Sequence, residues 1–151
     1  MIRIFSSSFI NSIKTRFPPK VYYIRNFDLG EPESDHYFME KRQRLAICMN
    51  SDDKPEPGQF KLEYGNDGEI LLFSMSSGNY LCCDGENGFS QYFIFNSKDK
   101  RRGAVFELFT LTTDGVVTLR ALGSYPILET AACVIGVSCG EETKFKFESA
   151  Q

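Results

Sequence analysis

One short pattern recurs along the chain: an apolar strand, a tight turn and a second strand. Its clearest copy spans residues 103–122 with a turn at Asp114-Gly115, and an earlier copy spans residues 58–74 with a turn at Asp67-Gly68. Residues 143–148 repeat the first half of the pattern. An Asp-Gly pair between two alternating apolar segments is a strong hairpin signal. The chain is therefore predicted to use one strand–turn–strand unit three times.

The side chains of the three copies alternate in one register. In each copy two apolar residues share a face, and the residue between them is expected to point outward. These positions are Phe60, Lys61 and Leu62; Phe106, Glu107 and Leu108; and Phe145, Lys146 and Phe147. Three such units suit a closed barrel with threefold symmetry, because closure removes the exposed strand edges.

The length and composition fit a single domain made of strands. A chain of 151 residues is long enough to bury a core of its own. It contains 14 Phe and 7 Tyr but no Trp, and aromatic and β-branched residues favour strands. No stretch with helical periodicity follows residue 20. Besides the Phe60 strand, strands are predicted at residues 21–26, 36–40, 44–49, 69–75, 79–83, 89–96, 104–111, 116–121, 125–128, 132–137 and 144–148.

Residues 1–20 differ in composition from the rest of the chain. They contain four cations and four serines, and no acidic residue occurs before Asp28. This composition is typical of a mitochondrial transit peptide, and the alternative is an extension that docks or frays beside the domain. Polar residues interrupt any apolar run of secretory-signal length, and no stretch is long enough to span a membrane. We expect a cytoplasmic protein, with a mitochondrial location as the alternative, and we expect deletion of residues 1–19 to leave the fold intact.

The five cysteines do not form the pattern of a disulfide framework or a zinc site. Their number is odd, two of them are adjacent, and no pair of CxxC motifs is present. We predict reduced thiols in a reducing compartment. The cysteines are Cys48, Cys82, Cys83, Cys133 and Cys139.

The repeated unit resembles a known fold family. A Phe-x-Leu strand, an Asp-Gly turn, a short apolar strand and a Gly-x-Tyr segment, at residues 78–81 and again at 123–127, resemble the β-trefoil of the fascin and hisactophilin type. The first unit departs from this pattern because no glycine precedes Tyr37. The resemblance implies an all-β fold in which residues 21–151 form three four-stranded repeats, a closed barrel with a hairpin cap, after the extension 1–20.

Related trefoils leave other functions open. Fibroblast-type growth factors and interleukin-like cytokines share the strand pattern, so a secreted signalling ligand is one alternative. A carbohydrate-binding trefoil is another, although ricin-type lectins carry a Gln-x-Trp signature and this chain has no Trp. The fascin-type resemblance itself implies a non-enzymatic module that binds a protein partner, with actin or another cytoskeletal element as the first candidate.

The residues offer little sign of catalysis or of a bound cofactor. His36 is the only histidine, and a lone histidine is more often structural than catalytic. The glycine-rich residues 84–88 lack the Lys-Ser/Thr ending of a phosphate-binding loop and the carboxylate spacing of a calcium loop. We therefore predict no enzyme activity, no cofactor and no metal site.

Two basic clusters remain as candidate partner-binding sites. Both lie in predicted loops, where binding residues are often found. The chain as a whole is acidic, with a net charge of −3, which argues against nucleic-acid binding through the overall field. A local cluster can still bind an acidic protein surface, whereas the alternative is a solvated charged loop. The candidates are Lys41, Arg42 and Arg44, and Lys98, Lys100, Arg101 and Arg102.

Overall fold

Six of the strands that the structure describes close into an antiparallel barrel. Each strand pairs with the next in the order β1–β4–β5–β8–β9–β12, and β12 pairs with β1. Their bounds are Val21–Asn26, Phe60–Tyr64, Ile70–Ser74, Phe106–Leu111, Val116–Ala121 and Lys144–Ser149. The computed structural model describes residues 7–26, 37–47, 56–66, 68–84, 91–100, 106–121, 128–130, 133–136 and 144–150. The predicted closed barrel is confirmed, and the chain is mostly β.

The strand register around the barrel can be followed at three buried phenylalanines, Phe60, Phe106 and Phe145, which we call the barrel phenylalanines. Each lies opposite one residue of each neighbouring strand. On the preceding strand of the barrel, Phe60 is opposite Tyr22, Phe106 is opposite Ile70, and Phe145 is opposite Val117. On the following strand, the partners of Phe60, Phe106 and Phe145 are Ser74, Ala121 and Asn26, respectively. The Ile70–Phe106 pair joins β5 to β8 and so closes the barrel.

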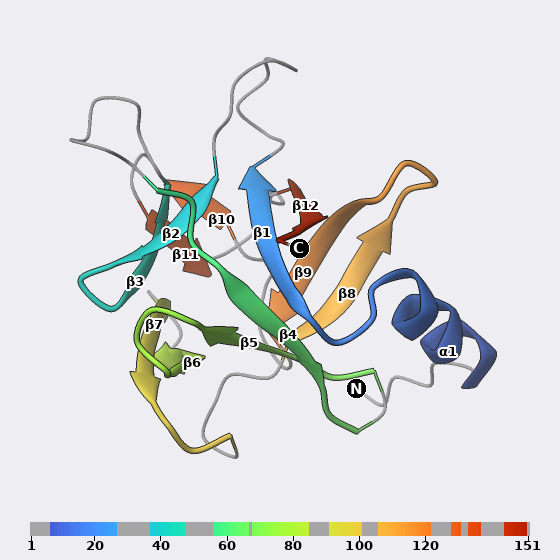
Figure 1. Cartoon of the computed structure of the whole chain (residues 1–151), viewed down its shortest axis with the longest axis horizontal. Helices are drawn as coiled ribbons and strands as arrows, with labels where there is room; N and C mark the ends of the chain where they lie inside the picture. Colours follow the sequence, from blue (N-terminus) through green and yellow to red (C-terminus); the bar gives the residue numbers. More distant parts are fainter. Residues whose placement is uncertain are drawn as a thin grey trace.

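The other six described strands form three hairpins at one end of the barrel (Figure 1). The hairpins are β2 (Phe38–Lys41) with β3 (Arg44–Ile47), β6 (Tyr80–Asp84) with β7 (Gln91–Ser97), and β10 (Leu128–Thr130) with β11 (Cys133–Gly136). Strand β7 also pairs with β3 and with β11. The hairpins therefore contact one another through β7.

Phenylalanines from the hairpins and from the barrel meet in the core. Phe38 of β2 lies 5.2 Å from Phe145, and Phe95 of β7 stacks on Phe60 at 5.6 Å between ring centroids. These four rings and Phe106 are almost completely buried. Each aromatic side chain buries a large apolar area, so these phenylalanines can fill the core without any Trp.

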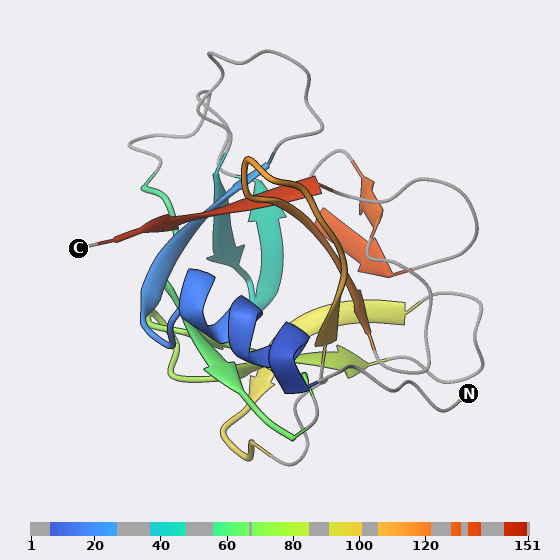
Figure 2. The same cartoon turned by 90° about the vertical axis from the view of Figure 1, so that its right-hand side faces the viewer.

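The helix α1 (Ser7–Arg16) lies across the barrel end opposite the hairpins (Figures 1 and 2). Its residue Ile13 and the following Phe17 are both 6% exposed and belong to the core. The Phe17 ring contacts Phe147 edge to face at 5.6 Å. The helix ends where Pro18 follows Phe17, since a residue before proline disfavours the helical conformation.

Polar contacts hold the same segment in place. The Arg16 guanidinium donates to the backbone carbonyls of Thr112 and Thr113 at 3.2 and 2.5 Å, at the β8–β9 turn. The Tyr64 hydroxyl donates to the Phe17 carbonyl at 2.6 Å. The segment thus docks on the barrel and supplies core side chains, which argues against the expectation that deletion of residues 1–19 leaves the fold intact.

The predicted register holds at the apolar positions and fails at one polar position. The barrel phenylalanines, Leu62, Leu108 and Phe147 are all buried, and Lys61 is exposed, as expected. Glu107 was expected to point into solvent but is only 3% exposed. Alternation along a strand assigns a residue to the outer face, but it does not tell which parts of that face other segments cover.

Most strand positions agree with the sequence-based expectation. Of the strand predicted at residues 125–128 only Leu128 is described, and it begins β10, which ends at Thr130. Residues 122–127 lie outside the described residues, as does Asp67 of the first Asp-Gly turn. Gly68 and Gly115 of the two turns have φ of 82° and 92°, a conformation that only glycine adopts at little cost.

Candidate functional site

The first predicted basic cluster lies at the β2–β3 turn. Arg42 and Gln43 both have positive φ, 52° and 66°, as a two-residue hairpin turn with type I′ geometry requires. Lys41 and Arg42 are exposed. Arg44 begins β3, and its side chain lies outside what the structure describes. The tight turn therefore projects at least two cationic side chains into solvent.

The second predicted cluster follows β7 directly. Lys98 and Lys100 are both exposed. The backbone N–H of Asp99 donates to the Ser97 hydroxyl at 3.1 Å, which fixes the start of this turn. Arg101 and Arg102 lie outside the described residues.

The structure brings the two clusters onto adjacent strands, although they are far apart in the sequence. Arg44 of β3 is opposite Ile94 of β7. The backbone N–H of Phe95 donates to the carbonyl of Gln43 at 2.6 Å. Lys98 follows three positions after Phe95. We call the exposed residues Lys41, Arg42, Lys98 and Lys100 the basic surface.

Glu63 of β4 connects this surface to the barrel. Its carboxylate lies 3.6 Å from Lys100 Nζ and 3.6 Å from Lys61 Nζ. The Tyr80 hydroxyl donates to Glu63 Oε2 at 2.8 Å. Sequence analysis did not single out Lys61 or Glu63 as site residues. Their i, i+2 spacing places them on one face of a strand, but the contact with Lys100 depends on the fold.

The environment of Tyr80 stabilises its neutral form. Desolvation by burial, followed by the hydrogen bond and the charge of Glu63, raises the pKa of Tyr80 to about 12. A phenol beside a carboxylate resists ionisation, because the phenolate would repel the carboxylate and lose the hydrogen bond it donates. The Tyr80 ring also contacts Phe73 at 5.1 Å. The Glu63 carboxylate is therefore held in a fixed position by a tyrosine that stays protonated.

A second tyrosine–glutamate pair has the same chemistry elsewhere on the molecule. The Tyr37 hydroxyl donates to Glu148 Oε2 at 2.6 Å, and Arg25 Nη1 lies 3.3 Å from Glu148 Oε1. The Arg25 guanidinium also lies over the Tyr37 ring at 5.7 Å. This pair and its neighbour Arg25 were not predicted either, because Arg25 and Tyr37 are distant from Glu148 in the sequence.

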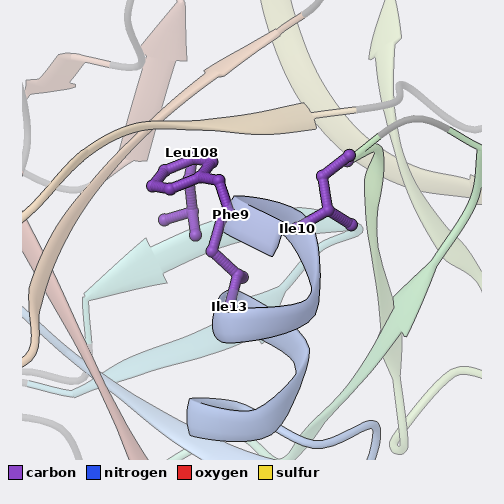
Figure 3. Close-up of a pocket in the computed structure, with 5 residues that line it drawn as sticks. Phe9, Ile10, Ile13 and Leu108 are labelled. Atoms are coloured by element: carbon purple, nitrogen blue, oxygen red, sulfur yellow. The ribbon is translucent and has the colours of Figure 1, made fainter. Parts of the chain in front are cut away.

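A small apolar pocket lies between α1 and the barrel. It is lined by Phe9, Ile10 and Ile13 of the helix together with Gly68 and Leu108 (Figure 3). Phe9 is 41% exposed, so the pocket opens toward solvent beside this ring. The lining contains no titratable side chain, and the pocket offers no group for acid–base chemistry.

The structure describes only some of the histidine and cysteine residues named above. His36 lies outside the described residues. Cys82 is a buried thiol that donates to the Tyr80 carbonyl at 3.3 Å. No group of three or more metal-binding side chains occurs among the described residues, and none of those residues forms a helix that is both long and apolar enough to cross a membrane.

No protein-family model matches this chain, and no curated protein matches it in sequence.

Proposed function

We propose that the chain is a β-trefoil. The pairing of the barrel phenylalanines supports this. Each of them is opposite a larger apolar residue on one neighbouring strand and a smaller residue on the other. Tyr22, Ile70 and Val117 are equivalent in this arrangement, as are Asn26, Ser74 and Ala121. Leu72 then corresponds to Leu119, the same match that the repeats in the sequence predict. One hairpin follows each of the barrel strands β1, β5 and β9, which is the strand order of a trefoil.

The two tyrosine–glutamate pairs give independent support. Under the threefold correspondence Tyr37 matches Tyr80, and Glu148 matches Glu63. The contact on each tyrosine ring also matches, since Arg25 over Tyr37 corresponds to Phe73 against Tyr80. A contact that recurs at equivalent positions is expected when one structural unit is repeated.

We infer that this trefoil is a non-enzymatic module that binds an acidic protein surface through the basic surface. The observation that carries this inference is the β3–β7 pairing, which places two cationic segments side by side on a chain with a net charge of −3. Within the described part of the chain, Arg42 and Lys98 are exposed and have no ion-pair partner. Unpaired surface cations on an acidic protein favour a local acidic ligand over a general polyanion such as nucleic acid.

The resemblance to fascin-type trefoils makes filamentous actin the first candidate partner, because actin filaments present an acidic surface. Fold resemblance alone does not establish a function, and a binding experiment tests this candidate. A single trefoil of this kind is proposed to bind a filament without cross-linking it.

Co-sedimentation with actin filaments tests the proposal. The double variant Lys98→Glu and Lys100→Glu should lower the bound fraction at least tenfold, and the wild-type chain should lose affinity as salt rises, because exposed charges are screened. The matched control is Lys144→Glu with Lys146→Glu on β12, which changes the net charge equally. Equal binding by both double variants would contradict the proposed site, and absence of wild-type binding would exclude actin as the partner.

A further inference from the structure

Glu63 is an acidic residue placed among the cations that the proposed function assigns to partner binding. Its carboxylate faces Lys61 on its own strand and Lys100 at the end of the basic surface, each at 3.6 Å. The two lysine side chains are 47% and 53% exposed, whereas that of Glu63 is 18% exposed. An incoming acidic group can therefore reach both ammonium groups from solvent while Glu63 stays largely covered.

Building on the proposed function, we propose that Glu63 is an internal competitor of the acidic partner. A carboxylate of the partner binds Lys61 and Lys100 in place of Glu63, so the binding surface extends from the β7 loop onto β4. Lys61 becomes a partner-binding residue, and Glu63 sets the affinity of the surface by occupying its cations when no partner is bound.

The geometry of the ion pairs supports an exchange of carboxylates. A separation of 3.6 Å is within ion-pair range, but it is longer than a good N–H···O hydrogen bond. The N–H donors of both lysines are therefore not used up by Glu63. A partner carboxylate can take hydrogen bonds that Glu63 does not make, because charge-assisted bonds are strongest at short distance.

Tyr80 explains why Glu63 would not follow the lysines when a partner binds. Its hydroxyl donates to Oε2, the same oxygen that faces Lys100. The Tyr80 ring packs against Phe73, so the donor itself has a fixed position. The carboxylate stays on the barrel and the exposed lysine side chains move toward the partner.

The variant Glu63→Gln tests this inference in the full-length chain. Glutamine removes the charge but keeps an oxygen that accepts the Tyr80 hydrogen bond. With a fluorescein-labelled poly-glutamate peptide as probe, we expect about 3- to 10-fold tighter binding at low salt, since each exposed lysine–carboxylate pair corresponds to a roughly 1.5- to 5-fold effect. Raising the salt should reduce the gain.

Glu148→Gln is the matched control. It removes one negative charge from the equivalent tyrosine–glutamate pair, on β12, and so has the same effect on net charge and on the hydrogen bond to tyrosine. Its affinity for the peptide should equal that of the wild type. Thermal melts of both variants check that neither change alters the fold.

The outcomes separate the two proposals. If Lys98→Glu with Lys100→Glu abolishes peptide binding but Glu63→Gln leaves it unchanged, the competitor role of Glu63 is wrong and the proposed site stands. Equal gains in Glu63→Gln and Glu148→Gln would also overturn it, because net charge alone would then explain the effect. A wild-type chain that binds RNA or anionic vesicles but not poly-glutamate overturns both proposals.

Discussion

Truncation of Phe17 to alanine tests whether the N-terminal segment is an integral part of the fold. Phe17 follows α1, its ring is 6% exposed, and it packs edge to face on Phe147 at 5.6 Å. Its carbonyl accepts the Tyr64 hydrogen bond, and this backbone contact remains available in the variant. The substitution therefore removes the ring and leaves the polar contacts of the segment in place.

The expected loss follows from burial and from the position of the ring. A Phe→Ala change in a core costs about 3–5 kcal/mol through lost apolar contact and the cavity that remains. About 1 kcal/mol of this belongs to the edge-to-face contact with Phe147. Because Phe17 lies at the end of the barrel, next to the short helix α1, its surroundings can partly close the cavity. We therefore expect a loss of about 3 kcal/mol, at the lower end of the range.

Urea unfolding followed by circular dichroism measures this loss as a lower unfolding midpoint at unchanged slope. For a chain of this length the same change lowers Tm by about 6–12 °C. Phe9→Ala is the control on the same segment. Phe9 is 41% exposed, so its truncation should cost less than about 1 kcal/mol.

A Phe17→Ala variant within about 0.5 kcal/mol of the wild type would refute the reasoning. It would mean that the ring contributes no burial in solution and that the segment only rests beside the barrel. Equal losses for Phe9→Ala and Phe17→Ala would refute it as well, because exposure would then not predict the cost.

Two further predictions concern the barrel and its tyrosine–glutamate contact. Phe106→Ala should cost about 3–5 kcal/mol, because Phe106 is fully buried where β5 and β8 close the barrel; a near-neutral result in the same urea assay would contradict the barrel register. Tyr80 has its pKa raised from 10.0 to about 12, so its contribution to stability is fully present below pH 10 and is lost as the pH rises through 12. Between pH 10 and 12 the free energy of unfolding should therefore fall less steeply in Tyr80→Phe than in the wild type. Parallel pH profiles of the two proteins would show that Tyr80 makes no such contribution.

The basic residues show how far the sequence leads at the candidate site. The two clusters were recognised because cations gather in polar segments between strands, and Lys41, Arg42, Lys98 and Lys100 are indeed exposed. Their function as a site remains a prediction. The contact between the two segments depends on the β3–β7 pairing, which joins residues about fifty positions apart and has no local signal.

The N-terminal segment shows the opposite case. Its basic, acid-poor composition drew attention to targeting, whereas Ile13 and Phe17 were not recognised as core residues. A ten-residue helix is marginal in isolation, and its apolar positions acquire their meaning from the barrel end that they cover. Composition describes the segment, but only the neighbouring strands show what it packs against.

The sequence by itself determined the strands, the Asp-Gly and other tight turns and the apolar face of each repeated strand. These features follow from alternation and from glycine's backbone freedom, which act over a few residues. The tertiary structure alone decided that α1 closes one end of the barrel, that Glu107 is buried, and that Glu63 lies between Lys61 and Lys100. Those facts depend on which segments, distant in the sequence, cover each face of a strand. These segments come together only when the barrel closes.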